Sequence, residues 1–77
     1  MSLKQTPNYL VLVKTKLYSG PLIMIVFSRE LEVLQRIQIE KLVSSEVQCV
    51  RESGDFLLVL LDSEVIRIDT TTWKWKK

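Results

Sequence analysis

Apolar and polar side chains alternate with a period of two along much of this chain, which predicts β-strands. The alternation is clear at 46–51 and at 64–69, where Val, Ile and Cys share the run with charged residues. Two further runs, 22–27 and 56–61, are apolar at every position, and such runs predict strands that are covered on both faces. Residues 9–13 form a similar run, and its β-forming character continues through residue 18.

Residues that favour turns separate these runs. Ser19-Gly20-Pro21 and Ser53-Gly54-Asp55 each contain a glycine, which adopts positive φ without steric cost, and Asp62-Ser63 marks a third turn. Short turns join consecutive strands as antiparallel neighbours. The positions of these turns therefore predict a meander of about six strands.

Residues 29–43 are ambiguous between strand and helix. Their Arg, Glu, Leu, Gln and Lys residues favour a helix, and Ser28 could cap it. The apolar residues form no stripe on a helical wheel, whereas at period two Leu31, Val33, Ile37 and Ile39 share one face. A half-buried strand is the favoured interpretation, and a helix is the alternative.

A weak internal repeat is present in the chain. Residues 9–13 (Tyr-Leu-Val-Leu-Val) are similar to residues 56–60 (Phe-Leu-Leu-Val-Leu), and each run is followed by a turn and a second β segment, at 22–27 and 64–69. The two copies lie about 40–50 positions apart, which is close to the spacing of four-stranded propeller blades.

On these residues the chain resembles the WD40-type β-propeller repeat, best over Val47–Trp73. Ile68-Asp69 stands where that family usually has Trp-Asp, and the Gly-His pair of the family is absent. The resemblance implies a blade-like sheet, and because a complete propeller needs at least four blades, it implies a fragment or a self-assembling unit.

The expected fold is therefore all-β, with about six strands in an antiparallel meander. The sheet is either propeller-blade-like or part of a small barrel or sandwich. Residues 1–8 are expected to be a flexible leader, and residues 9–77 a single small β domain. A domain of this size buries only about 60% of the surface that its unfolded chain exposes, so its stability is expected to be marginal.

Composition argues against catalysis and against a metal or cofactor site. The chain has no histidine, one cysteine (Cys49) and two glycines, so neither a zinc ligand set, nor an activated thiol, nor a glycine-rich phosphate loop can be assembled. A lone cysteine fits a reducing compartment, and we expect an intracellular, cytoplasmic protein. The apolar runs are too short for a membrane helix, and no membrane association is expected.

The candidate binding residues are aromatic and lysine side chains near the two ends of the chain. All nine acidic residues lie between Glu30 and Asp69, which leaves the ends basic. In an extended tail, Trp73 and Trp75 would point to one side and Lys74 and Lys76 to the other. The complete candidate set is Tyr9, Lys14, Lys16, Tyr18, Trp73, Lys74, Trp75, Lys76 and Lys77.

These residues permit two interpretations. The aromatic rings could stack on bases while the lysines meet phosphates, as in a small nucleic-acid-binding β-barrel. Alternatively, the Trp rings cap the core or pack on a partner, and the lysines keep an end strand soluble. The favoured function is a non-catalytic protein–protein interaction or assembly module. We expect it to be a homo-oligomer or part of a larger complex, because strands that are apolar on both faces need cover that a short chain cannot readily supply.

Overall fold

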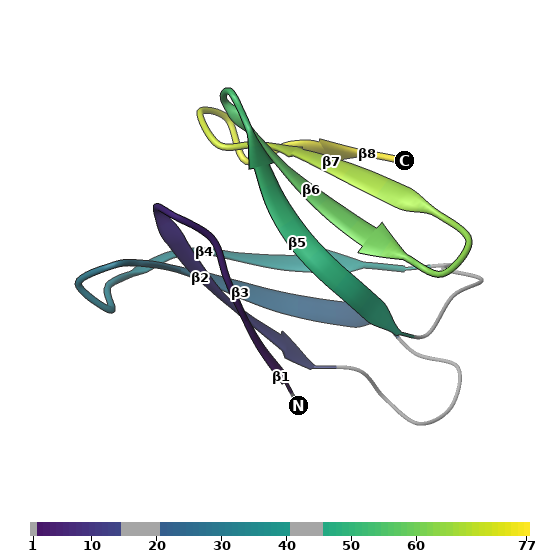
Figure 1. Cartoon of the computed structure of the whole chain (residues 1–77), viewed down its shortest axis with the longest axis horizontal. Helices are drawn as coiled ribbons and strands as arrows, with labels where there is room; N and C mark the ends of the chain where they lie inside the picture. Colours follow the sequence, from purple (N-terminus) through teal and green to yellow (C-terminus); the bar gives the residue numbers. More distant parts are fainter. Residues whose placement is uncertain (1, 15–20, 41–45) are drawn as a thin grey trace.

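The computed structural model describes residues 2–14, 21–40 and 46–77, and these form two four-stranded antiparallel sheets (Figure 1). The first sheet consists of β1 (Ser2–Gln5), β2 (Tyr9–Lys14), β3 (Leu22–Ser28) and β4 (Val33–Ile39). The second consists of β5 (Val47–Ser53), β6 (Phe56–Leu61), β7 (Val65–Asp69) and β8 (Trp75–Lys76). In each sheet the strands follow one another in chain order, so each is a meander.

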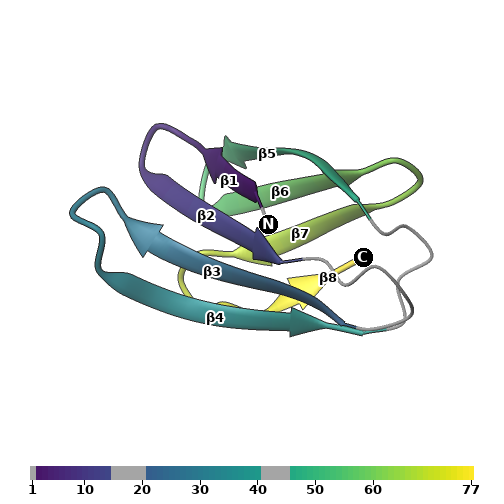
Figure 2. The ribbon, with the colours of Figure 1, turned by 90° about the horizontal axis from the view of Figure 1, so that it is seen from below.

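The two sheets lie in two layers with one core between them, and β1 lies beside β5 (Figures 1 and 2). Alternate residues of the strands point into this core, as the period of two requires. The core residues are Val11, Val13, Leu22, Met24, Val26, Ile37 and Ile39 from the first sheet and Val47, Val50, Leu57, Val59, Leu61, Ile66 and Ile68 from the second.

The all-β prediction is confirmed, with eight strands among the described residues where about six were expected. The two additional strands, β1 and β8, are short and lie at sheet edges. β1 occupies part of the expected flexible leader: Ser2–Gln5 pairs along β2, which satisfies backbone groups that this edge of β2 would otherwise leave open. The predicted strand extension to Tyr18 and the connection at 41–45 lie outside the described residues.

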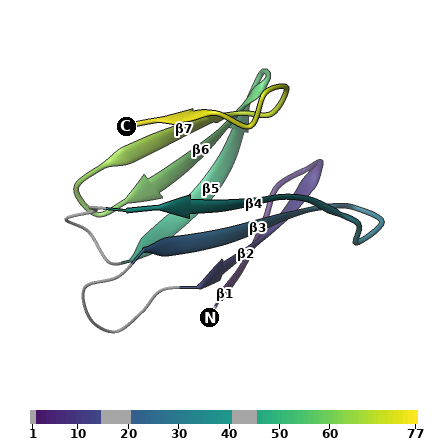
Figure 3. The same cartoon turned by 180° about the vertical axis from the view of Figure 1, so that it is seen from behind.

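Residues 33–39 form strand β4, seen from behind in Figure 3, so the strand interpretation of this stretch is confirmed and the helix alternative is wrong. The expected buried face is only half correct, because Ile37 and Ile39 are buried while Val33 is 63% exposed. The register shifts where Val26 pairs with Gln35 and Phe27 with Val33, so Leu34 is an extra residue on β4. A bulge of one residue moves the side chains beyond it to the opposite face.

The internal repeat falls on equivalent strands of the two sheets. Its first segment forms β2 in one sheet and β6 in the other, which are the second strands of their meanders. Its second segment forms β3 and β7, which are the third strands.

A polar cluster at one end links the two sheets. Glu52 on β5 accepts hydrogen bonds from the Thr6 hydroxyl (2.5 Å), the Asn8 backbone N–H (2.6 Å) and the Asn8 side-chain amide (2.9 Å), all from the β1–β2 turn. Partial burial alone would raise the pKa of the Glu52 carboxyl, but the hydrogen bonds from Thr6 and Asn8 favour the ionised form, and its pKa lies below the ordinary value. Nearby, Lys4 Nζ donates to the carbonyl oxygen of Gln48 at 3.5 Å.

Candidate functional site

The two tryptophans of the C-terminal tail pack against the core. Trp73 and Trp75 are half-buried, and Tyr9 joins them at the edge of the core cluster. The rings of Tyr9 and Trp73 meet edge to face, with centroids 6.3 Å apart and planes at 85°. Two of the predicted site residues, Tyr9 and Trp73, are thus brought together, and all three rings pack on the core as expected for rings that cap it.

The predicted lysines do not form one patch. Lys74 and Lys76 are exposed on the second sheet, and Lys77 Nζ lies 3.6 Å from the Glu64 carboxylate. Lys14 is exposed at the end of β2, next to Val13, which points into the core, so its side chain belongs to the outer face of the first sheet. Lys16 and Tyr18 lie outside the described residues. Lys14 therefore lies on the outer face of the first sheet and Lys76 on that of the second, so the predicted lysines do not share one surface.

The outer face of the first sheet is apolar at its centre. Register places Leu12 between Leu3 and Ile25, and Leu10 between Gln5 and Phe27. The central side chains on this face, Leu10, Leu12, Ile23, Ile25 and Phe27, are all half-buried. Leu3 is 60% exposed and Val33 is 63% exposed at the two edges.

The outer face of the second sheet combines apolar and cationic side chains. Phe56, Leu58 and Leu60 of β6 are half-buried there, and Val65 beside Leu60 is 51% exposed. A single row across the sheet reads Arg51, Leu58, Arg67 and Lys76, from β5 to β8. We call this set of four the cationic row.

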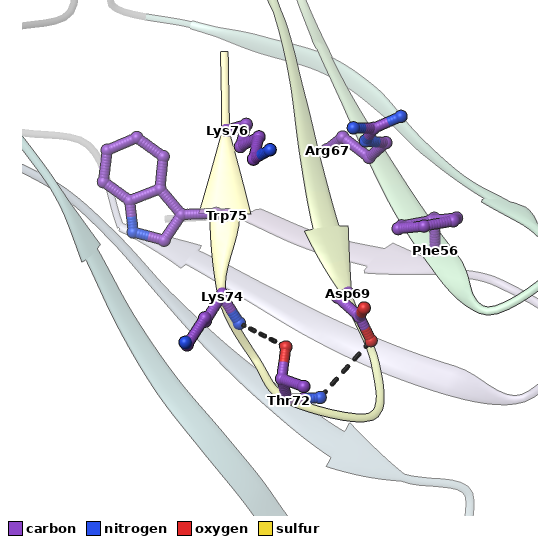
Figure 4. A pocket seen from close by; sticks show the side chains of 7 residues that line it. All are labelled: Phe56, Arg67, Asp69, Thr72, Lys74, Trp75 and Lys76. Carbon is purple, nitrogen blue, oxygen red and sulfur yellow. Dashed lines mark hydrogen bonds between the residues drawn. The ribbon is translucent and has the colours of Figure 1, made fainter.

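A shallow pocket of about 380 Å³ opens next to this row (Figure 4). Its walls include Phe56, Arg67, Asp69, Lys74 and Lys76. The Arg67 guanidinium lies 4.9 Å from the centroid of the Phe56 ring, a distance at which cation and ring attract. Figure 4 shows the Trp75 ring leaving β8 on the side opposite to Lys76. The pocket therefore presents positive charge and two aromatic residues, Trp75 and Phe56, and the ring of Phe56 is already in contact with a cation.

Asp69 carries the negative charge in this pocket, and its position is set by the β7–β8 turn. Its Oδ1 accepts hydrogen bonds from the backbone N–H groups of Thr71 (2.7 Å) and Thr72 (3.3 Å). The Thr72 hydroxyl in turn accepts from the backbone N–H of Lys74 at 3.4 Å. The carboxylate thus holds a turn together, and one of its oxygens is occupied by that role.

The described residues contain no group of three or more His, Cys, Asp or Glu side chains arranged to hold a metal ion. Cys49 is half-buried and pairs with Leu60 across the sheet, as a small apolar side chain would. In the same part of the chain, no helix is long and apolar enough to cross a membrane.

The cationic row was missed by sequence reasoning, which concentrated on the lysines at the chain ends. Arg51, Arg67 and Lys76 lie on three different strands, and only the register brings them into line. Alternation offered a signal for Arg67, which lies between the apolar Ile66 and Ile68. It offered none for Arg51, which shares its phase in the sequence with Val47 and Cys49 and reaches the outer face through the register shift between those two residues.

Comparison of the chain with models of protein families, with curated protein sequences and with solved structures gives no match.

Proposed function

We propose that this chain is a non-catalytic assembly module that binds other proteins, copies of itself included, through the outer faces of its two sheets. The observation that carries the proposal is the apolar character of both outer faces. In a two-layer β protein the outward positions are ordinarily polar. Here β3 carries Ile23, Ile25 and Phe27 outward, and β6 carries Phe56, Leu58 and Leu60 outward. Contiguous apolar surface of this kind marks interaction sites.

The arrangement of the strands supports a WD40-like, blade-based assembly. Each sheet is a four-stranded meander, and the internal repeat occupies the second and third strands of both. Propellers repeat such sheets around an axis. A chain with two blade-like sheets needs further sheets against both outer faces to complete that architecture.

The nucleic-acid alternative has less support. Base stacking requires aromatic faces that are open to the ligand. Trp73, Trp75 and Tyr9 instead pack against the core, and the rings of Tyr9 and Trp73 contact each other. The tail that suggested nucleic-acid binding therefore serves packing.

The first sheet is the surface on which we expect self-association. Its outer face has the longer apolar rows, and Lys14 and Arg36 lie at its margins. Two copies can cover each other's leucine and isoleucine side chains there, which would remove this surface from water.

Light scattering at micromolar concentration tests this expectation. The chain should have a mass above 9.0 kDa. Ile25→Lys places a charge in the middle of the apolar face and should reduce the mass toward that of one chain. Gln38→Lys adds the same charge at an exposed position near the margin and serves as the matched control. A 9.0 kDa species for the unmodified chain across the micromolar range would contradict self-association.

A further inference from the structure

The cationic row of the second sheet places like charges next to each other without compensation. Arg67 on β7 lies directly opposite Lys76 on β8, and Arg51 stands on the other side of Leu58 in the same row. Like charges that face each other directly across two strands destabilise a sheet. Lys74 extends the positive charge into the adjoining pocket.

Among the described residues of this face, Asp69 is the acid next to the row, and it is engaged in its own turn. Asp69 contributes one negative charge, whereas Arg51, Arg67, Lys74 and Lys76 each contribute a positive charge. The face therefore retains net positive charge, and the complementary partner is anionic.

The same face also has an apolar part. Leu58 lies within the cationic row itself, flanked by Arg51 and Arg67, and Leu60 and the exposed Val65 lie one row away. A partner that covers this face must supply apolar side chains as well as negative charge. Phosphate or a simple anion meets only half of that requirement.

We infer that the outer face of the second sheet binds an acidic segment of a protein partner, with carboxylates beside Arg67 and Lys76 and apolar side chains on Leu58 and Leu60. The inference rests on the proposed function and specifies the partner chemistry of one face. Carboxylates pair well with guanidinium groups. An extended segment presents both kinds of side chain to the sheet when every second residue, on the side that faces the sheet, is in turn acidic and apolar.

A protein partner fits this face better than a nucleic acid does. Two aromatic residues, Phe56 and Trp75, line the pocket beside the cations, and the Arg67 guanidinium lies over the Phe56 ring. The Trp75 ring leaves β8 on the side opposite to Lys76 and packs against the core (Figure 4). Bases would find leucine and valine side chains in place of open aromatic platforms.

Nuclear magnetic resonance titration of the full chain tests the inference. The probes are a peptide that repeats Glu-Ser-Val-Ser, so that glutamate and valine lie on the same side of an extended chain, a matched peptide that repeats Lys-Ser-Val-Ser, and oligothymidylate. The glutamate peptide should shift the backbone amide signals of Leu58, Arg67 and Lys76, and added salt should reverse these shifts. The lysine peptide should leave the signals unchanged.

The double variant Arg67→Gln/Lys76→Gln removes the charges from exposed positions and should weaken binding of the glutamate peptide about tenfold. Arg36→Gln removes a charge from the outer face of the first sheet and should leave this affinity unchanged. No shift with the glutamate peptide, equal binding by the double variant, or tighter binding of oligothymidylate at the same residues would overturn the inference. The proposed function would survive such a result if the unmodified chain still self-associates and Ile25→Lys still abolishes that association.

Discussion

The hydrogen bonds of Glu52 make a measurable contribution to stability, and replacing this residue by glutamine should show it. The substitution keeps the size of the side chain and one oxygen acceptor, but it removes the charge. It also places an NH2 group where the carboxylate now accepts from the Asn8 side-chain amide at 2.9 Å. Thr6, whose hydroxyl donates to the carboxylate, is only 5% exposed, so water cannot readily replace that bond.

The expected cost follows from the strength of the bonds that change. A hydrogen bond to a charged group contributes about 1.5–3 kcal/mol and a neutral one about 0.5–1.5 kcal/mol, a difference of about 1 kcal/mol per bond. Asn8 is exposed, and its bonds count for less than that of Thr6. Glu52→Gln should therefore lower the free energy of unfolding by about 1–2 kcal/mol, out of a total of about 4–12 kcal/mol for a chain of this length.

Urea unfolding followed by tryptophan fluorescence measures this cost, since Trp73 and Trp75 pack on the core. With a slope of about 1 kcal/mol per molar urea, the midpoint should fall by about 1–2 M. All samples need one fixed protein concentration, because self-association also stabilises the folded chain. Glu30→Gln, which removes the same charge from an exposed turn, is the control and should shift the midpoint little.

The pH dependence gives the strictest test of this reasoning. The pKa of Glu52 is lowered in the folded chain, so its stabilisation is present above the unfolded value of about 4.3 and is lost as pH falls through the lower folded value. The difference between the unmodified chain and Glu52→Gln should be constant from neutral pH down to about pH 5 and then shrink. A difference that is absent at neutral pH, or that grows on acidification, would refute the role assigned to these bonds.

Two further substitutions test the core and one turn. Leu57→Ala should lower the free energy of unfolding by about 2–5 kcal/mol in the same urea assay, because Leu57 is fully buried between the sheets. Leu34→Ala, at the exposed bulge, should lower it by less than about 0.5 kcal/mol. Equal losses would contradict the different burial of the two residues. Gly54 has φ of 57° in the two-residue β5–β6 turn, and the space around it is open. Gly54→Ala should therefore lower the stability measured by thermal unfolding by about 1 kcal/mol through backbone strain alone, and Gly54→Asn should lower it less. Equal stability of the alanine and asparagine variants would argue against strain as the cause.

The outer faces differ in the kind of partner that they favour. On the first sheet the apolar side chains dominate, with Lys14 and Arg36 at the margin. On the second sheet Arg51, Arg67 and Lys76 cross the centre of the face. Two second-sheet faces placed against each other would bring these charges together, which opposes self-association there and favours an acidic partner.

Local sequence determined strands β2 to β7 and the turn that joins β5 to β6. Period-two alternation identified 64–69, and the apolar run at 56–61 identified a central strand, because each pattern depends only on neighbouring residues. Gly54 marked the tight turn for the same reason, since the requirement for positive φ is local. The same reasoning correctly favoured a strand at 33–39 over a helix.

Tertiary structure decided which strands form which sheet and which side chains meet. The division into two packed sheets, the pairing of Ser2–Gln5 with β2 and the bulge at Leu34 all depend on residues that are distant in the chain. The cationic row exists only because the register of three strand pairs brings Arg51, Arg67 and Lys76 into line, and a shift of one residue would turn any of them to the other face. Alternation therefore specifies that a residue lies on a face, while long-range pairing specifies which neighbours it has there.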